Sequence, residues 1–496
     1  MRDYYRDCTF LGIKPIEILH RYGVNGKISG SVAAIAEIQN AQPILHAPIG
    51  CGFHYRTSAR TRFSPSYKLE ATNLASDDII FGGEEKLKAE IQKADAVKKP
   101  DLIAVVPSCI SAIINDDISS IVKEAQTHTR AKLIHVRSEA FSHPNKNSSL
   151  KRLQERVANS GKKTAASKVQ YEGCGFVEVL NALVEQVMEP HKVLPGTVNI
   201  ESFAWGFGGA RRLALVRSKL EKIGLQVNCF LPTATVKQME AAPQAELNIV
   251  RRLRWAQRMQ QKFNTPYLHF PSLDDWHGPE AIHDFYVLIA QQFGLEKIAE
   301  KVLQEEWQQV SQRLKEVKAY LGQFRYVLVT HAISAVPELI RLYERDYAMP
   351  LTDICLFLPD SYSHDTGIDQ HTLHKMYDNI STALAQTGSK AVLAMNPGEQ
   401  ELRSIFKHAD CIVGTNQLQF EGKGAAVLPQ IHDYRPFDYE QYAVILENFA
   451  AKIKNKKEKK HLLLSRLTYS QDYYPLLADA DSLASREMWI KMWRTR

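Results

Sequence analysis

Short apolar runs alternate with longer amphipathic stretches along most of the chain. This alternation is typical of parallel strands joined by crossover helices, because each buried strand needs a helix to return the chain to the same edge of the sheet. The predicted fold class is therefore α/β with mainly parallel sheets. We expect strands at Ile44-Leu45, Leu102–Val106, Lys132–Val136, Val198–Phe203, Tyr326–Thr330, Ile354–Leu358, Ala391–Ala394 and Cys411–Val413.

A chain of 496 residues exceeds what a single hydrophobic core usually serves, so several domains are expected. We predict three blocks. Residues 1–195 form an N-terminal α/β domain that ends in a polar segment, 142–168, read as an exposed loop or insertion. Residues 196–325 form a second α/β domain ending in a charged helix, and residues 326–496 form a third with a basic tail.

Composition excludes several classes of protein. The 45% hydrophobic and 24% charged content is that of an ordinary globular chain, and the net charge of +7 is spread along it. No basic stripe is interleaved with aromatic residues, so nucleic acid is not an expected partner. No window approaches the roughly 18 apolar residues of a membrane-spanning helix, and the first residues lack the apolar core of a signal peptide. We therefore expect a cytoplasmic protein without a membrane partner.

Seven scattered cysteines without a CxxC pair argue against a disulfide framework and against a zinc finger. Cys51 follows a predicted strand and is flanked by Gly50 and Gly52, and Cys109 follows the strand Leu102–Val106. Open α/β sheets bind their ligands at the carboxyl ends of strands, and soft thiolates suit iron–sulfur clusters. Free cysteines are also among the most buried residues, so chemistry alone leaves cluster ligands and inert core thiols as equal alternatives. The remaining cysteines after Cys109 lie on apolar runs and are expected in the core.

Four strings resemble the catalytic-component subunits of nitrogenase in order, content and spacing. They are His46-Ala47-Pro48-Ile49-Gly50-Cys51-Gly52, Asp77-Asp78-Ile79-Ile80-Phe81-Gly82-Gly83, the run from Lys99 to Cys109, and Asn115-Asp116-Asp117-Ile118. Further along, Trp205-Gly206-Phe207-Gly208-Gly209, Leu247–Val250 and Pro266-Tyr267 fall where that family has a glycine turn, a helix and a strand. The resemblance covers residues 25–295 well and the last two hundred loosely.

The resemblance implies three Rossmann-like α/β domains and a homologous sister subunit, in an α2β2 heterotetramer. It also implies an interfacial iron–sulfur cluster, P-cluster-like or four-iron four-sulfur, that receives electrons from a separate ATP-dependent iron protein. Cys51 and Cys109 match two of the three cysteines that each nitrogenase subunit gives to its P-cluster. The third is missing near Asn25 to Lys27, so either Cys8 replaces it through a rearranged N-terminal segment or the cluster is smaller.

At the family's second metal site, which holds a larger iron–sulfur cofactor, this chain departs from the pattern. The position of the cofactor cysteine aligns with Arg252, and His432 is a candidate match for the cofactor histidine. Arg60 follows Cys51 in the loop that leads toward the cofactor cavity, where a guanidinium group could orient a polar substrate. A solvated loop and a structural histidine are the alternatives. The chain is thus either a β-type subunit or an α-type subunit with a rebuilt pocket.

The leading functional hypothesis is a subunit of a nitrogenase-like, ATP-dependent reductase, an oxidoreductase that transfers electrons through the interfacial cluster. Methylthio compounds, tetrapyrroles and dinitrogen are substrates compatible with the family, and the missing cofactor cysteine argues against dinitrogen. A non-catalytic scaffold for nitrogenase cofactor assembly is the main alternative, and a binding module that has lost its metal is a third.

Overall fold

The computed structural model describes residues 27–53, 55, 69–138, 175–201, 209–270, 278–330, 333–358, 370–413, 426–428 and 437–454. These residues contain three sheets whose strand pairs are all parallel. The chain divides into a larger compact unit, Val24–Trp276 with Glu280–Trp307, and a smaller one, Met1–Gly23 with His277–Pro279 and Gln308–Arg496. The boundary falls within the long helix α15 (Glu296–Leu321).

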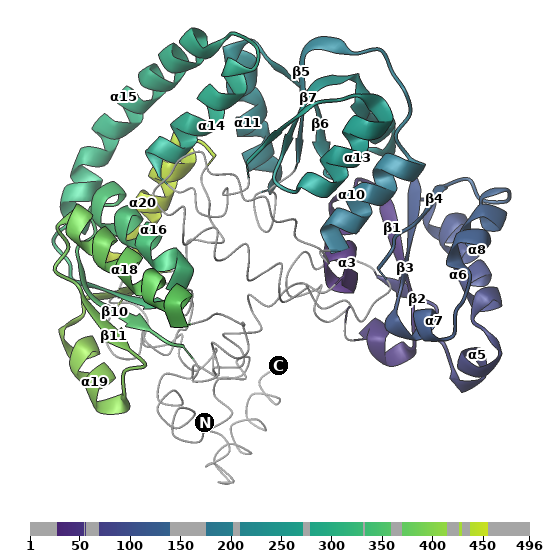
Figure 1. Ribbon diagram of the computed structural model, residues 1–496, viewed down its shortest axis with the longest axis horizontal. Coiled ribbons are helices and arrows are strands. Elements are labelled where there is room, and N and C mark those ends of the chain that lie inside the picture. Colours follow the sequence, from purple (N-terminus) through teal and green to yellow (C-terminus); the bar gives the residue numbers. More distant parts are fainter. Residues whose placement is uncertain are drawn as a thin grey trace, which may run out of the picture. The chain divides into compact units, whose positions relative to one another are not determined.

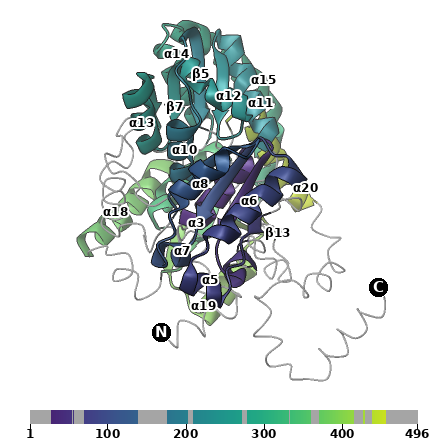
Figure 2. The same ribbon diagram turned by 90° about the vertical axis from the view of Figure 1, so that its right-hand side faces the viewer.

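The first sheet of the larger unit has the order β2-β1-β3-β4. Its strands are Glu70–Ala71 (β2), Ala41–His46 (β1), Leu102–Pro107 (β3) and Lys132–His135 (β4). Alternate residues bury opposite faces, as expected for a parallel sheet covered on both sides. One face, which includes Ile44 and Val105, packs on α6 (Glu84–Lys98) and α8 (Ile118–Gln126). Figure 2 looks onto these two helices.

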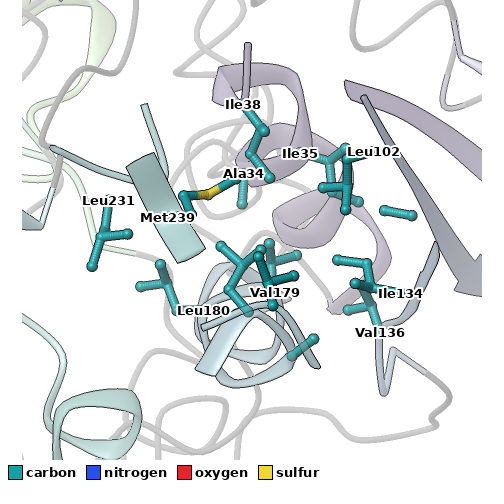
Figure 3. Close-up of a cluster of buried hydrophobic side chains, with 14 of the residues drawn as sticks. Ala34, Ile35, Ile38, Leu102, Ile134, Val136, Val179, Leu180, Leu231 and Met239 are labelled. Carbon is teal, nitrogen blue, oxygen red and sulfur yellow. The ribbon is translucent and has the colours of Figure 1, made fainter. Parts of the chain in front are cut away.

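The opposite face of this sheet packs on helices α3 (Lys27–Glu37) and α10 (Gly175–Gln186), which lie on the other side of the strands in Figure 1. The two helices cross closely, because a Cβ atom on Gly175 would lie 1.7 Å from the carbonyl oxygen of Lys27. Ile35 of α3 and Leu180 of α10 belong to the same hydrophobic core, part of which is drawn in Figure 3. The same core includes Leu231, from a strand of the second sheet, and Met239, from the helix after that strand. Both sheets of the larger unit therefore share one hydrophobic interior.

The second sheet of the larger unit has the order β6-β5-β7-β8. Its strands are Gln226–Leu231 (β6), Leu194–Glu201 (β5), Ala245–Val250 (β7) and Tyr267–His269 (β8). Its helices are α11 (Gly209–Ile223), α12 (Val236–Glu240), α13 (Leu253–Phe263) and α14 (Pro279–Gln291), with a 3₁₀ turn at Ala242–Gln244 (η1). Two buried amides join its central strands, since Asn199 Nδ2 donates to Asn248 Oδ1 at 2.9 Å.

The helix expected at Leu247–Val250 is wrong, because these residues belong to strand β7. Asn248 lies fully buried in the middle of the sheet, where its side chain bonds to the neighbouring strand. The helix begins only at Leu253, so the family resemblance placed it about one turn too early. The strand expected at Pro266-Tyr267 is present as β8.

The smaller unit contains one five-stranded sheet with the order β11-β10-β9-β12-β13. Its strands are Val392–Met395 (β11), Leu351–Leu356 (β10), Tyr326–Thr330 (β9), Cys411–Val413 (β12) and Ala426–Val427 (β13). Its short helical segments are a 3₁₀ turn at Ile333–Ala335, α16 (Val336–Ile340) and a π-helical turn at Arg341–Asp346, and its longer helices are α18 (Gln370–Thr387), α19 (Glu399–His408) and α20 (Tyr439–Lys454).

The predicted α/β class with parallel sheets is confirmed. Each expected strand overlaps an observed one, whereas β2, β6, β7 and β13 are additional strands that the apolar pattern did not reveal. Each of the three predicted blocks contains one sheet, yet the first two sheets lie in one compact unit because their core is continuous. The polar segment 142–168 lies outside the described residues.

Candidate functional site

The register of the first sheet brings the two candidate cysteines to the same edge. Strands β1 and β3 pair in parallel, with His46 opposite Pro107 at their carboxyl ends. Cys51 lies in a helical turn, residues 49–53, that follows β1, and Cys109 is the first residue of α7 (Cys109–Ile113), which follows β3. The thiol-bearing segments therefore leave neighbouring strands at the edge where α/β sheets bind ligands.

Backbone hydrogen bonds fix both segments to the sheet. The Ser108 N–H donates to the His46 carbonyl at 3.1 Å, which ties the start of α7 to the end of β1. The Gly52 N–H donates to the Pro48 carbonyl at 3.2 Å and closes the turn that contains Cys51. Ser108 also caps α7, accepting from the Ser111 N–H at 3.4 Å. The backbone on either side of each cysteine is thus held in place without the thiols themselves.

The thiols of Cys51 and Cys109 are both half-buried. Burial raises the pKa of the Cys51 thiol above its ordinary value, and the negative charge of a Cys109 thiolate raises it further. Two thiolates that repel each other at close range are stabilised by a positive centre placed between them, as when a metal binds. A metal bound by both thiols would therefore favour their deprotonation.

A buried histidine links the segments that surround the cysteines. The His46 ring is fully buried, with Nδ1 3.1 Å from Thr72 Oγ1 and Nε2 2.8 Å from Asp116 Oδ2. Burial lowers the pKa of His46, and the Asp116 carboxylate opposes that shift. The neutral ring then donates from Nε2 to Asp116 and accepts the Thr72 hydroxyl at Nδ1. His46 lies at the end of β1, shortly before Cys51, and Asp116 follows α7, which contains Cys109.

Gly83 completes this network, because Asp116 also accepts its N–H, at 3.1 Å to Oδ1 and 3.3 Å to Oδ2. A Cβ atom on Gly83 would lie 2.7 Å from Leu74 Cδ2, 2.9 Å from His46 Cε1 and 3.0 Å from Asp116 Oδ2. Only glycine fits there without displacement of its neighbours. We call His46, Thr72, Gly83 and Asp116 the strand-end clamp.

His46, Gly83 and Asp116 lie in the strings that resemble the family, yet the sequence alone assigned these residues no role. A usable signal was present: an ionisable histidine at the end of an apolar strand needs a buried partner. Which carboxylate supplies it could not be read from the sequence, since Asp116 is 70 residues away in the chain.

An exposed apolar rim lies on the elements that hold the cysteines and on α5 (Ser76–Phe81), which ends at the clamp. Ile49 and Phe53 belong to the turn around Cys51, Ile113 ends α7, and Ile80 and Phe81 end α5; their exposed fractions are 68%, 69%, 62%, 71% and 85%. A set of large apolar side chains left in water on neighbouring elements is typical of a surface that another chain covers. The half-buried thiols and the rim thus belong to the same edge of the sheet.

The donor set fits half of an iron–sulfur site. Four thiolates commonly hold such a cluster, and this chain brings two together. Within the described residues, no group of three or more His, Cys, Asp or Glu side chains is arranged to hold a metal ion. The further ligands of a cluster at this position would have to come from a second chain or from residues outside the described ranges. Cys8, the candidate third ligand, is among the latter.

Arg252, at the position aligned with the family's cofactor cysteine, forms an ion pair with the fully buried Glu201 at the end of β5. Glu201 Oε2 also accepts the Arg252 N–H at 2.9 Å and the Trp255 indole N–H at 3.0 Å. The guanidinium carbon lies 4.3 Å from the centre of the Phe176 ring. Arg252 thus neutralises a buried carboxylate, which accounts for its burial without a substrate.

The other candidate residues divide into two groups. His432 and Arg60 lie outside the described residues, so their assignment to a pocket stays a prediction. Cys229, Cys355 and Cys411 are buried, as expected of core thiols, and burial raises the pKa of Cys229 to about 12. Across the described ranges, no helix combines the length and apolar character needed to cross a membrane.

Comparisons with known proteins show what this chain is similar to. The sequence model of the family described as nitrogenase component 1 type oxidoreductase matches residues 27–416. The chain is 27% identical over 290 residues to the nitrogenase iron-molybdenum cofactor biosynthesis protein NifE of Clostridium pasteurianum, and the match covers 56% of each chain. It is 23% identical over 245 residues to one of the subunits of light-independent protochlorophyllide reductase from Leptolyngbya boryana, covering 48% of this chain and 45% of that one. The chain thus spans about half the length of the curated relatives it matches.

Among solved structures, nitrogenase Cp1 at pH 6.5 matches with a TM-score of 0.60, covering 88% of this chain and 93% of that one. Sequence identity over the match is 14%, so the similarity concerns the fold alone. It confirms the expected architecture of parallel-sheet α/β layers.

Proposed function

Because this chain belongs to the family of nitrogenase component 1 type oxidoreductases, we propose that it is one subunit of a nitrogenase-like, ATP-dependent reductase complex. In this proposal Cys51 and Cys109 hold an iron–sulfur cluster together with ligands of a homologous sister subunit, in an α2β2 assembly. A separate ATP-dependent iron protein supplies the electrons. The resemblance in the four strings and the donor set at the strand ends support the proposal.

The convergence of Cys51 and Cys109 at one sheet edge is the observation that carries the proposal. The two cysteines follow neighbouring strands whose carboxyl ends pair directly, and both are half-buried at a surface with an apolar rim. Inert core thiols, the alternative left open by the sequence, are better represented by Cys229 or Cys355, which are fully enclosed. A cluster held here would be covered only when a partner chain closes over the rim.

In this proposal the cysteines, the strand-end clamp and the apolar rim have separate roles. Cys51 and Cys109 would bind the cluster, which supplies single-electron transfer when bound. The strand-end clamp would hold the two thiol-bearing segments at a fixed separation, and Ile49, Phe53 and Ile113 would exclude water once the partner docks. Exclusion of water and fixed hydrogen bonding are the means by which proteins set the potential of a cluster.

The proposed substrates follow from the missing cofactor cysteine. Arg252, already bound to Glu201, stands where the cofactor cysteine of nitrogenase is expected, so dinitrogen reduction on a cofactor held in the usual way is not favoured. Tetrapyrrole double bonds or methylthio compounds are the substrates we propose in its place. Similarity to a protochlorophyllide reductase supports the tetrapyrrole class.

A scaffold for nitrogenase cofactor assembly is the second candidate function. It is favoured by the similarity to NifE, whose name describes a cofactor biosynthesis protein and which matches at higher identity than the protochlorophyllide reductase. Reductase and scaffold would use the same two thiols but differ in the fate of the metal. A reductase retains its cluster through turnover, whereas a scaffold transfers metal to another protein.

The test is anaerobic co-purification of the chain with a homologous subunit, followed by iron and acid-labile sulfide analysis and electron paramagnetic resonance after dithionite reduction. Iron and a reducible signal are expected in the wild type and in the core-thiol control Cys229→Ala. Both should be lost in the double variant Cys51→Ala, Cys109→Ala. Equal iron in the double variant and the wild type would exclude these thiols as cluster ligands.

A second experiment separates the two functions. The complex is loaded with ⁵⁷Fe, incubated with MgATP and the iron protein, and mixed with an apo-acceptor protein, after which the proteins are separated. Retention of the label by this chain supports the reductase. Transfer of most of the label to the acceptor supports the scaffold and contradicts the reductase.

A further inference from the structure

A cavity of about 200 Å³ lies in the larger unit beside the edge strand β4 and does not include Cys51 or Cys109. Helices α8, α10 and α13 and the end of β4 bound it, and its lining includes Lys123, His135, Arg137, Asn181, Glu185 and Arg258. Pockets for drug-sized ligands measure about 300–1,000 Å³. This cavity therefore suits a compact ligand and is too small for a nucleotide or a tetrapyrrole.

Asn181, on the α10 side of the cavity, has a buried side chain that is only 3% exposed. Within the part of the chain that the structure describes, neither its amide nitrogen nor its amide oxygen has a hydrogen-bond partner. An unpaired buried polar group costs about 1–3 kcal/mol, so such a group calls for a bound water, ion or ligand. A ligand that satisfies Asn181 must both accept a hydrogen bond from Nδ2 and donate one to Oδ1.

The acidic residues of the cavity are already neutralised. Glu178 pairs with Arg254 Nη1 at 3.0 Å, and Glu185 pairs with Arg258. Gln186 is also occupied, since its side chain exchanges hydrogen bonds of 3.0 and 2.9 Å with the His135 backbone. Because each carboxylate is paired with an arginine, the two glutamates repel a bound anion only weakly.

Two exposed cations at the cavity, Lys123 and Arg137, make no hydrogen bond or ion pair with any described residue. Two acidic residues lie near Lys123 in the chain. Glu124 of α8 pairs with Lys88 at 3.0 Å. Asp117, the N-cap of α8, accepts from the Ser120 N–H at 3.0 Å and from the Ser120 hydroxyl at 2.7 Å, and the charge of Lys123 helps to lower its pKa. The uncommitted charge of the cavity is therefore positive. An oxyanion is the ligand class that matches it.

We propose that this cavity binds a phosphate group, either as free hydrogen phosphate or as a small phosphate monoester. Lys123 and Arg137 bind its charged oxygens, Asn181 Nδ2 donates to a further oxygen, and Asn181 Oδ1 accepts a ligand hydroxyl. Sulfate has a similar size and charge but no proton near neutral pH, so it cannot satisfy Asn181 Oδ1. The site should therefore distinguish phosphate from sulfate, which a purely electrostatic surface patch would not.

Isothermal titration calorimetry of the full chain with inorganic phosphate, sulfate and glycerol 3-phosphate, at pH 7.5 and constant ionic strength, tests the proposal. Phosphate should bind at least tenfold more tightly than sulfate. The double variant Lys123→Gln, Arg137→Gln should weaken phosphate binding at least tenfold, whereas Lys297→Gln, an exposed charge on α15 that does not line the cavity, should leave it unchanged. Tighter binding of glycerol 3-phosphate than of phosphate would identify a monoester as the ligand, and the reverse would identify the free ion.

The variant Asn181→Leu separates binding from folding. It removes the unpaired amide while conserving volume, so it should fold with an equal or higher melting temperature and lose the preference for phosphate over sulfate. Equal binding of phosphate and sulfate to the wild type, or phosphate binding that survives both the double variant and Asn181→Leu, would overturn the proposal. Neither result bears on the cluster, because no cavity-lining residue belongs to the cysteine site.

Discussion

Asp116 and Asp117 are adjacent carboxylates with opposite structural roles. Asp116 is buried and accepts from His46 and Gly83, whereas Asp117 is an exposed N-cap of α8 that binds Ser120. Asp116→Ala leaves two buried donors unpaired and should lower the free energy of unfolding by about 3 kcal/mol. Asp117→Ala should cost clearly less, because water replaces its bonds. Calorimetric melting of both variants measures the two changes. An equal loss of unfolding free energy in the two variants would mean that the buried hydrogen bonds of Asp116 stabilise the fold no more than an exposed helix cap does.

Gly83→Ala tests the close approach within the clamp. The added methyl group would overlap Leu74, His46 and Asp116, so a destabilisation of about 1–3 kcal/mol is expected. Gly50 is a matched control in the same unit, since nothing lies within 4 Å of a Cβ built there. Urea denaturation should show a lower midpoint for Gly83→Ala and a midpoint near wild type for Gly50→Ala. Similar midpoints for the two variants would contradict the packing described here.

His46 should make the larger unit less stable in mild acid. Its folded-state pKa lies below the ordinary value of 6.5, so the unfolded chain binds more protons and stability falls as the pH drops through 6.5. The melting temperature of the wild type relative to His46→Gln should therefore decrease between pH 7.5 and 5.5.

His283 provides a control of opposite sign. Partial burial lowers its pKa, but the carboxylates Glu300 and Asp284 outweigh burial and raise it. Its contribution is present below pH 6.5 and is lost as the pH rises through the folded-state pKa. The wild type relative to His283→Gln should thus gain stability over the same fall in pH. Parallel trends for the two histidines would contradict the assigned protonation states.

At the level of single residues, the sequence predicted that Cys51 and Cys109 each follow an apolar strand, and both do. Their role as cluster ligands stays a prediction. The sequence did not predict the clamp, since His46 and Asp116 meet only when β1 and β3 pair and α7 turns back. The partner of Arg252 could not be identified from the sequence either. Its aligned position suggested a pocket, whereas its partner Glu201 lies 51 residues earlier in the chain.

Among the elements, strands with uniform apolar runs were predicted well, and β9 was found with the bounds expected for it. Strand β6 was missed because Gln226 and Asn228 interrupt its apolar pattern. Strand β7 was missed because the family resemblance was read as a helix at its position. Polar side chains that pair across a sheet, such as Asn199 with Asn248, hide a buried strand from a hydrophobicity pattern.

Helix α5 makes a prediction at this scale, because its last two residues are large, apolar and exposed. Phe81→Ser should leave the stability of the isolated chain within about 0.5 kcal/mol of wild type, since the ring contributes little to the core. It should weaken association with the sister subunit tenfold or more, measured by analytical ultracentrifugation. Val97→Ser is the control, because Val97 is 74% exposed on α6 and lies outside the rim. Equal association of wild type and Phe81→Ser would place the interface elsewhere.

For the whole molecule, the sequence predicted the α/β class with parallel sheets but not that two of the sheets share a core. Residues from α3, α10 and both sheets of the larger unit form one apolar cluster, and such sharing depends on faces that no local pattern identifies. The cysteine site follows from this arrangement. It lies at the carboxyl ends of β1 and β3, with two half-buried thiols where a cluster commonly needs four.

Native mass spectrometry of the anaerobically purified complex tests this central claim most directly, because it reports subunit composition and bound iron and sulfide together. We expect a complex of this chain and its homologue with the added mass of a cluster. That added mass should be lost in the variant Cys51→Ala, Cys109→Ala but not in Cys229→Ala. An assembled complex without added iron and sulfide, or with the same added mass in the double variant, would contradict the claim.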